Sequence, residues 1–206
     1  MKIIFGTTNK RKIEDLKNII NQLNLDLEIL SLNDINWKLG EIEETGKTIE
    51  ENSLIKAEVI YDYCKKNNIS YPIITDDSGL FCEALNGKPG IYTKRYANIE
   101  SSKNNDLPRY QGVIKLLNDL NNTKNRNASY KCCVTCMMQN GTYFQEIGKS
   151  KGYIANEIIG ELKKPYFYSV FILDEYNKVF SELKEKELIT TFRYKALTKI
   201  LKKIKK

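Results

Sequence analysis

The chain of 206 residues contains no histidine. This absence excludes three kinds of site that depend on imidazole: nucleophiles activated by histidine, zinc held by histidine, and proton shuttles that titrate near neutral pH. Any acid–base or metal chemistry therefore has to use carboxylates, lysines, hydroxyls or thiols.

Long apolar segments are also missing. The longest apolar run, residues 166–173, contains a serine and is far shorter than the ~20 residues that cross a bilayer. Near the N-terminus only residues 3–5 form an apolar run, whereas a signal peptide needs an apolar region of ~7–15 residues. We therefore expect a cytoplasmic protein that does not span a membrane.

The cysteines are few and odd in number: Cys64, Cys82, Cys132, Cys133 and Cys136. Three of them fall in one strand-like segment, residues 128–138. A zinc site needs ligand pairs at turn spacing and a second pair elsewhere, and the sequence offers neither. The sequence therefore favours buried, reduced thiols.

The charge balance is basic, with 33 Lys and Arg against 26 Asp and Glu, a net charge of +7. Part of this excess lies in residues 199–206, where Ile200, Leu201 and Ile204 recur at helical spacing. This pattern favours an amphipathic terminal helix with a solvated basic face over a nucleic-acid-binding tail. Nucleic acid is not an expected partner.

The first half of the chain alternates strand and helix signals. Residues 2–7 and 25–29 have strand character, and helical spacing of apolar residues lies between them. Thr48 and Glu51 form a capping box that predicts a helix reaching about residue 67, with Asn52 and Lys56 on one face. A strand over 71–75 then leads into Asp76-Asp77, which we expect at the strand's carboxyl end, where ligands bind in open α/β sheets.

The second half continues as an α/β chain. A turn cluster covers 86–90, a helix is expected around 113–120, and 121–127 is an Asn-rich loop. Asn140-Gly141 predicts a hairpin between strands at 128–139 and from 142 onward. A strand over 166–173 and the terminal helix follow, giving an α/β fold with a mixed sheet and one domain over residues 1–206.

Three groups of polar residues suggest phosphate and metal chemistry. Residues 6–12 form a strand-to-helix junction with three cations in four residues, which suits a phosphate chain, although an ordinary N-cap with a basic turn gives the same pattern. Glu41, Glu43 and Glu44, together with Asp76 and Asp77, offer the hard oxygen ligands that Mg²⁺ takes. Adjacent acids are also common at caps and turns.

The order of five motifs is more specific than any single one. Thr-x-Asn-x-x-Lys at 7–12 is followed by Glu-Thr-Gly-x-Thr at 44–48 and Glu-Asn-x-x-x-Lys-Ala at 51–57, then by Asp-Asp-Ser-Gly-Leu at 76–80 and Gly-x-Pro-Gly-Ile-Tyr at 87–92. This order closely resembles the inosine triphosphate pyrophosphatase family. The resemblance is close over residues 2–97 and weaker to residue 201.

The resemblance implies both a fold and an activity. Family members hydrolyse non-canonical purine nucleoside triphosphates, such as ITP, dITP and XTP, to the monophosphate and pyrophosphate with Mg²⁺. Their fold is an elongated mixed β-sheet with flanking helices and two lobes around a central cleft, usually in a homodimer.

Site residues follow from the same resemblance, position by position. It implies catalytic roles for Asp76, Asp77 and Lys56, with Asp77 the favoured base, although the two acids can exchange roles. The implied metal ligands are Glu44, Asp76 and Asp77. The implied substrate-binding residues are Thr8, Asn9, Lys12, Ser78, Lys94, Tyr168 and Arg193.

The chain departs from the family pattern where the base is recognised. Ser169 stands where the family has Asp, and Phe192 stands where it has His, while Arg193 remains. Phe192 either faces the base or joins the apolar face of the last helix, and the aromatic residues 166–168 either stack on a base or pack internally. Two alternatives to the family activity follow: the same chemistry with altered base selectivity, or a nucleotide- or RNA-binding protein without activity.

Overall fold

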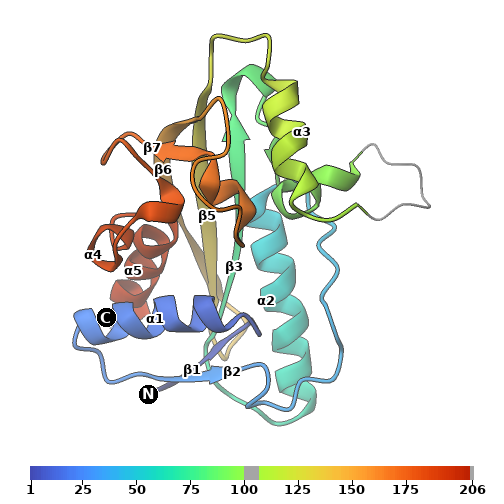
Figure 1. Cartoon of the computed structure of the whole chain (residues 1–206). Coiled ribbons are helices and arrows are strands. Elements are labelled where there is room, and N and C mark those ends of the chain that lie inside the picture. Colours follow the sequence, from blue (N-terminus) through green and yellow to red (C-terminus); the bar gives the residue numbers. More distant parts are fainter. Residues whose placement is uncertain (100–106, 205–206) are drawn as a thin grey trace. The chain divides into compact units, whose positions relative to one another are not determined.

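A computed structural model describes residues 1–99 and 107–204 of the chain (Figure 1). The strands are β1 (Lys2–Phe5), β2 (Glu28–Ser31), β3 (Ile73–Cys82), β4 (Pro89–Gly90), β5 (Asn127–Met137), β6 (Tyr143–Ile154), β7 (Phe171–Leu173) and β8 (Lys178–Val179). The α-helices are α1 (Lys10–Gln22), α2 (Ile49–Lys66), α3 (Gln111–Asp119), α4 (Glu185–Leu188) and α5 (Phe192–Ile204). The 3₁₀ helices are η1 (Glu83–Leu85), η2 (Thr93–Asn98), η3 (Tyr166–Ser169) and η4 (Phe180–Glu182). Among the helices described, none combines the length and apolar character needed to cross a membrane.

The strands form one mixed sheet in the order β2-β1-β3-β5-β6-β7-β8, with β4 paired to β3. β1 pairs in parallel with β2 and β3, and the antiparallel pairs include β3 with β4, β6 with β7 and β7 with β8. The mixed sheet with flanking helices predicted from the sequence is therefore confirmed.

The chain divides into two compact units. The first comprises residues 1–77, 132–148 and 189–206, and the second comprises 78–131 and 149–188. β3, β5 and β6 each contribute residues to both units. The single domain expected from the sequence stays a prediction.

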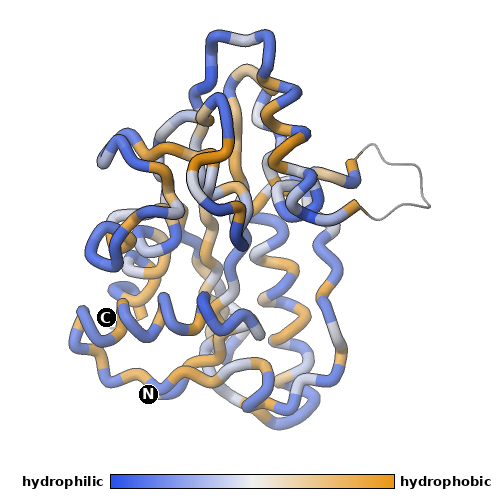
Figure 2. Tube along the Cα trace, viewed as in Figure 1, coloured by the Kyte–Doolittle hydropathy of each residue, from blue (hydrophilic) through white to orange (hydrophobic). Residues whose placement is uncertain are grey.

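In the first unit, α2 lies on one side of β3, and α1 and α5 lie together on the other side (Figure 1). The apolar face of α2 packs its buried residues Ala57, Ile60 and Cys64 in a cluster with Ile4 and Ile73 from β1 and β3. Figure 2 shows helices with both hydrophilic and hydrophobic residues, as expected for helices that pack one face against a sheet and expose the other face. Apolar packing against the two faces of the sheet fixes the positions of α1, α2 and α5, the helices that carry polar site residues.

Two helix starts in this unit agree with the sequence. Asn9 caps α1 by accepting a hydrogen bond from the Arg11 amide, 3.0 Å away. Thr48 caps α2 by accepting from the Glu51 amide at 3.1 Å, which confirms the predicted cap.

The second unit has an aromatic core. Tyr130, Tyr168, Phe171 and Phe180 are all buried, and the rings of Tyr168 and Phe180 lie with their centres 4.0 Å apart. α3 corresponds to the helix predicted around 113–120, although it runs from Gln111 to Asp119, and it buries Val113. In the first unit, the Asn140-Gly141 hairpin is also confirmed, because the Met138 amide donates to the Thr142 carbonyl across the turn.

Three predicted strand boundaries are wrong. The segment 166–173 is not one strand: residues 166–169 form η3, in which the Ser169 hydroxyl donates to the Tyr166 carbonyl at 2.6 Å, and only 171–173 form β7. The strand expected at 25–29 is β2 at 28–31, since Asn24 takes a positive φ of 47° and the Leu25 amide still bonds back to the helix.

The third correction concerns the acids. The strand expected to end at residue 75 runs on to Cys82, so Asp76 and Asp77 lie in the middle of β3 and not at its carboxyl end. β3 continues because its later residues pair with β4, where Leu80 and Phe81 oppose Gly90 and Pro89. A Cβ on Gly79 would come within 2.3 Å of the Gly90 carbonyl oxygen, so this close pairing requires glycine.

The five cysteines are free and buried, as predicted. Burial raises the pKa of each thiol, to about 11 for Cys64 and about 12 for Cys82, Cys133 and Cys136. The predicted amphipathic terminal helix is confirmed over α5, which buries Ile200 and Leu201. Residues 205–206 of the basic run lie outside the described residues.

Candidate active site

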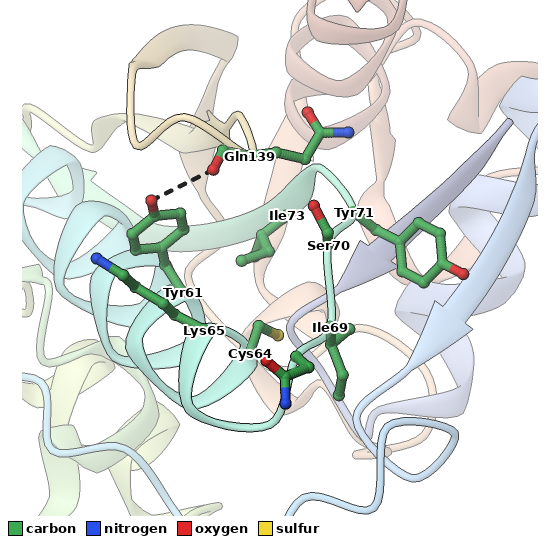
Figure 3. A pocket seen from close by; sticks show the side chains of 9 residues that line it. Tyr61, Cys64, Lys65, Ile69, Ser70, Tyr71, Ile73 and Gln139 are labelled. Atoms are coloured by element: carbon green, nitrogen blue, oxygen red, sulfur yellow. Dashed lines mark hydrogen bonds between the residues drawn. The ribbon is translucent and has the colours of Figure 1, made fainter.

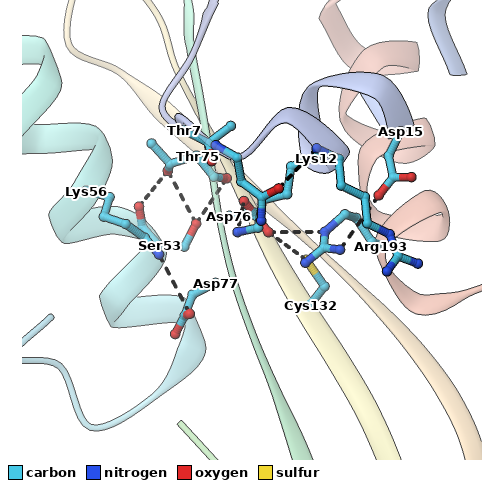
Figure 4. Close-up of polar contacts among 12 residues, drawn as sticks. Thr7, Lys12, Asp15, Ser53, Lys56, Thr75, Asp76, Asp77, Cys132 and Arg193 are labelled. Atoms are coloured by element: carbon cyan, nitrogen blue, oxygen red, sulfur yellow. Dashed lines mark hydrogen bonds and ion pairs between the residues drawn. The ribbon is translucent and has the colours of Figure 1, made fainter. Parts of the chain in front are cut away.

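Asp76 and Asp77 are consecutive residues of β3, so their side chains point to opposite faces of the strand. Figure 4 shows Asp77 directed toward α2 and Asp76 directed toward α1 and α5. The two acids therefore have different neighbours, although they are adjacent in the sequence.

On the α2 side, three charged groups and one amide meet. The Lys56 ammonium lies 2.8 Å from Glu44 Oε1 and 3.6 Å from Asp77 Oδ1. The Asn52 amide nitrogen donates to Asp77 Oδ2 at 3.3 Å. Asn52 and Lys56 thus share one face of α2, as their spacing predicted, and that face is aimed at the acid.

Asn52 is a residue of this site to which the sequence reasoning gave no role. Its side-chain oxygen accepts from the Gly46 amide at 2.8 Å, while its nitrogen donates to Asp77, so it links the segment after Glu44 to β3. A Cβ on Gly46 would lie 2.7 Å from the Asn52 oxygen, so glycine is required for this approach. The sequence signal for Asn52 was its position four residues before Lys56, which places both side chains on one face of the helix.

On the other side of β3, Asp76 is surrounded by cations. The Lys12 ammonium of α1 lies 2.8 Å from Asp76 Oδ1, and the Arg193 Nε of α5 lies 3.3 Å from Oδ2. The Cys132 thiol donates to the same Oδ2 at 3.8 Å. Both carboxylate oxygens are therefore already engaged, and the side chain is only 2% exposed.

A second acid, Asp15, faces the same arginine. Its Oδ2 lies 3.8 Å from Arg193 Nη1, and its side chain is 15% exposed. Asp15 follows Lys12 by three residues in α1, which places both on one helix face. Sequence reasoning did not identify Asp15, because nothing in the sequence indicates that α1 packs beside α5.

These charges alter the protonation of their neighbours. Burial alone would raise the pKa of Asp76, but Lys12 and Arg193 outweigh it and hold this pKa below its ordinary value. Burial opposes the charge of Lys56, yet the neighbouring acids, Asp77 foremost, leave its pKa raised. Burial raises the pKa of Asp15, with Arg193 acting in the opposite direction.

A buried network of hydrogen-bonded hydroxyls lies beside the two acids. The Thr75 hydroxyl donates to the Ser53 carbonyl at 2.6 Å, and the Thr135 hydroxyl donates to Ser53 Oγ at 2.7 Å. The Gln145 amide donates in turn to the Thr135 hydroxyl at 2.9 Å. This chain joins α2, β3, β5 and β6 immediately beside Asn52 and Asp76.

The remaining predicted residues of the first unit lie at the start of α1. Thr8 and Asn9 are exposed in the turn between β1 and α1, and Asn9 is the N-cap. Together with Lys12, Glu44, Lys56, Asp76, Asp77 and Arg193 they belong to one compact unit. Of these eight residues, six are in direct contact, Lys12 and Arg193 with Asp76, and Lys56 with Glu44 and Asp77.

Three predicted residues belong to the second unit: Ser78, Lys94 and Tyr168. Ser78 is partly buried in β3, and Lys94 is exposed in η2. Tyr168 is 7% exposed and packs among the aromatic rings of the unit's core, which favours the internal-packing alternative for its ring.

The two positions that depart from the family pattern are buried. Phe192 is 1% exposed and belongs to the core side of α5, and Ser169 is 1% exposed with its hydroxyl bonded to the Tyr166 carbonyl. The alternative that assigns Phe192 to the apolar face of the last helix is therefore the one that its burial supports.

A cavity of about 320 Å³ lies elsewhere in the first unit, beside the carboxyl end of α2 (Figure 3). Tyr61 and Tyr71 line it, and the Tyr61 hydroxyl donates to the Gln139 carbonyl at 3.3 Å. None of the predicted site residues lines this cavity.

The model of the Ham1 family matches residues 3–203. The chain belongs to the Ham1 family. Family members similar to it include the dITP/XTP pyrophosphatase of Clostridium perfringens, 36% identical over 212 residues that cover 99% of this chain and 97% of that protein. The dITP/XTP pyrophosphatase of Flavobacterium johnsoniae is 34% identical, with 89% and 86% covered. The resemblance drawn from the motifs is thus confirmed.

Solved Ham1 structures share the fold. The Staphylococcus aureus Ham1 protein aligns with a TM-score of 0.79 at 28% identity, covering 99% of this chain and 97% of that one. A dITP/XTP pyrophosphatase from Mycobacterium abscessus aligns with a TM-score of 0.68 at 26% identity, covering 91% of each chain.

Proposed function

We propose that this Ham1 protein is a nucleoside triphosphate pyrophosphatase that hydrolyses non-canonical purine nucleotides, such as ITP, dITP and XTP, to the monophosphate and pyrophosphate. One observation carries the proposal: Lys12, Lys56 and Arg193 converge from three helices on the consecutive acids of β3. Cations suit a triphosphate, and carboxylates among them suit metal binding and proton transfer during its hydrolysis. The names of the relatives from Clostridium and Flavobacterium support the same activity.

The protein's own groups divide the work. Lys12 and Arg193, with side chains 23% and 12% exposed, offer N–H donors to phosphate oxygens. Lys56 offers a third positive charge on the other face of β3. These groups neutralise the charge that builds up on the departing pyrophosphate.

Asp77 is the proposed base. Its carboxylate is held by Asn52 and Lys56 and is more exposed than that of Asp76, 12% against 2%. As a water oxygen bonds to the α-phosphorus and the bond to pyrophosphate breaks, one water proton passes to an Asp77 oxygen. The products are the monophosphate and pyrophosphate.

The residues fit a Mg²⁺ ion. Glu44 and Asp77 both contact the single ammonium of Lys56, so two hard carboxylates already face one point of positive charge. Mg²⁺ usually takes one or two carboxylates and completes its shell with phosphate oxygens and water. When bound by Glu44 and Asp77, the ion would neutralise phosphate charge and lower the pKa of the attacking water.

A second candidate keeps this chemistry with a broader choice of base. It is favoured by the burial of Phe192 and Ser169, the positions where the family pattern has His and Asp. Neither side chain is exposed enough to read the edge of a purine, so discrimination between bases has to come from other groups.

A nucleotide panel tests the proposal. We expect pyrophosphate release from ITP, dITP and XTP in the presence of Mg²⁺ and none in the presence of EDTA. Inorganic phosphate as the product would show cleavage at the γ-phosphorus and contradict the proposal. Absence of turnover on every nucleotide, combined with binding, would favour the non-catalytic alternative.

The homodimer implied by the resemblance is part of the proposal. Light scattering at micromolar concentration is expected to give twice the monomer mass of 23.9 kDa. A monomer at that concentration would contradict it.

A further inference from the structure

The side chain of Asn52, near the start of α2, is polar and yet 0% exposed. A buried amide loses its hydrogen bonds to water, which is unfavourable unless groups of the protein replace them. Two groups do so here: the Asn52 oxygen accepts from the Gly46 amide at 2.8 Å, and its nitrogen donates to Asp77 Oδ2 at 3.3 Å. Asn52 therefore connects the segment that follows Glu44 to the strand that carries the proposed base.

The segment after Glu44 lies directly against the start of α2. A Cβ on Gly46 would come within 2.7 Å of both the Asn52 oxygen and the Glu51 Cβ, so this approach requires glycine. The Lys47 amide donates to Glu51 Oε2 at 2.6 Å, which adds a second hydrogen bond between the segment and the helix. The backbone that follows Glu44 is therefore held in one place, and the Asn52 side chain is one of the groups that hold it.

Lys56 and Asn52 contribute differently to the two acids. The Lys56 ammonium contacts Glu44 Oε1 at 2.8 Å and Asp77 Oδ1 at 3.6 Å, and it attracts any carboxylate within reach because its charge has little directional preference. The planar amide of Asn52 binds its partners only along fixed directions. Lys56 therefore draws Glu44 and Asp77 together, whereas Asn52 fixes the backbone of the Glu44 segment relative to the Asp77 carboxylate.

We propose that Asn52 is a positioning residue that holds the Glu44 segment and Asp77 in the arrangement in which their carboxylates bind Mg²⁺. The inference rests on the proposed function and deepens it. Side chains that hold metal ligands by hydrogen bonds typically contribute about 10–100-fold to metal affinity, because the ligands are already oriented when the ion arrives. An amide suits this position because it offers an acceptor to Gly46 and a donor to Asp77 at once, which an ionised carboxylate cannot do.

Asn52→Leu and Gly46→Ala test this contact from its two sides. Leucine is similar in size to asparagine and removes both hydrogen bonds. Alanine at position 46 leaves the Asn52 amide in place, but its Cβ would lie 2.7 Å from the Asn52 oxygen, so the Glu44 segment has to move away from α2.

Gln145→Leu is the matched control. Gln145 also carries an amide beside the start of α2, and its hydrogen bonds go to the Glu50 carbonyl and the Thr135 hydroxyl, neither of which belongs to the Glu44 segment or to β3. Its replacement therefore removes an amide beside the same helix and leaves the Asn52 contacts intact.

Each protein is measured in three ways. Electron paramagnetic resonance gives the Kd of Mn²⁺ added alone, and Mn²⁺ serves as the probe because it takes oxygen ligands as Mg²⁺ does. Pyrophosphate release from ITP gives the Mg²⁺ concentration at half-maximal rate. Urea denaturation gives the free energy of unfolding.

We expect the Kd of Mn²⁺ and the half-saturating Mg²⁺ concentration to rise about tenfold or more in both Asn52→Leu and Gly46→Ala. Gln145→Leu should lose stability, because it leaves a carbonyl and a hydroxyl with one partner fewer, and it should keep both metal values of the wild type. A residue that acts on stability alone would change the free energy of unfolding and leave the Kd of Mn²⁺ for the folded protein unchanged.

Wild-type metal values in folded Asn52→Leu would overturn the inference, as would the absence of Mn²⁺ binding by the wild type. An equal rise in Gln145→Leu would also overturn it, because the effect would then belong to the packing of α2. If Asn52→Leu does not fold, Gly46→Ala decides, and an unchanged Kd of Mn²⁺ there overturns the inference. Failure of the proposed function gives a different result: Mn²⁺ binding would still weaken in both variants, while the wild type released no pyrophosphate from any nucleotide.

Discussion

At the scale of single residues, the alternation of β3 separates two acids that look equivalent in the sequence. Asp77 meets Asn52 and Lys56, and Asp76 meets Lys12 and Arg193. A motif gives the order of residues but not the face of the strand, and the face decides the neighbours. The different neighbours support the proposed role of Asp77 as base, which the motif resemblance already implied.

Replacing Asp77 by Asn is expected to lower kcat at least ~10²-fold, the usual scale for the loss of a positioned proton acceptor. Folding should persist, because the amide can still accept from Asn52. The measurement is pyrophosphate release from ITP at saturating Mg²⁺, with tripolyphosphate binding in EDTA as the readout of an intact phosphate site.

Asp62→Asn serves as the control, since Asp62 is an exposed acid of α2 and its variant changes the net charge equally. Near-normal turnover of Asp77→Asn would remove Asp77 from the mechanism.

Phe192→His is expected to destabilise the protein without sharpening base selectivity. Phe192 is 1% exposed, so an imidazole there loses apolar packing and buries a polar ring, at a cost of about 2 kcal/mol or more. Urea denaturation and kcat/KM ratios for ITP and GTP measure the two effects. Phe192→Leu, which keeps an apolar side chain, should lose less stability. An unchanged unfolding free energy with a steeper ITP preference would show that residue 192 reads the base.

At the scale of elements, the sequence predicted well what depends on local pattern. The capped start of α2 and the hairpin at Asn140-Gly141 rest on contacts between residues close in sequence, and the prediction of α5 rests on the local spacing of its apolar residues. The end of β3 was predicted wrongly, because pairing with β4 extends the strand through its polar residues. Asp15 was missed for the same kind of reason, since its partner Arg193 is distant in the sequence.

The aromatic segment 166–173 shows the limit of apolar runs as strand signals. Its side chains are buried as a strand's would be, but Ser169 bonds to the Tyr166 carbonyl and holds a 3₁₀ turn. Short apolar runs do not distinguish a strand from a buried turn, because burial alone sets their composition.

The hydroxyl network beside the acids gives a prediction for packing of α2 on the sheet. Thr135→Val should lower the free energy of unfolding by about 1–3 kcal/mol, because it leaves Ser53 Oγ without the hydroxyl that donates to it and Gln145 without one acceptor. Thr135→Ser keeps the hydroxyl and should lose less. Urea denaturation of the three proteins tests this, and equal stability of the Val and Ser variants would contradict it.

At the scale of the whole molecule, the paired acid Asp76 links stability to pH. Its pKa is lower in the folded protein than in the unfolded chain, so its ionisation stabilises the fold above about pH 3.9, and this contribution is lost as the pH falls below that value. The difference in unfolding free energy between wild type and Asp76→Asn should therefore shrink on going from pH 7 to pH 3. Chemical denaturation along that range measures it, and a difference independent of pH would contradict the ion-pair assignment.

Base selectivity is also a property of the whole enzyme. It is the ratio of kcat/KM values for nucleotides that carry the same triphosphate group and differ in their base. The phosphate contacts proposed for Lys12, Lys56 and Arg193 touch no base atom, so they cancel in that ratio. A site that hydrogen-bonds a base edge rejects an analogue by ~10⁴-fold or more, whereas a stacking or apolar pocket discriminates only modestly. Since Phe192 and Ser169 are both 1% exposed, we expect ITP and XTP to be preferred over GTP and ATP by much less than ~10⁴-fold. The deoxy forms should follow the same order. Initial rates of pyrophosphate release for the eight nucleotides give the comparison, and a preference for ITP near ~10⁴-fold would show that other side chains replace the missing Asp and His.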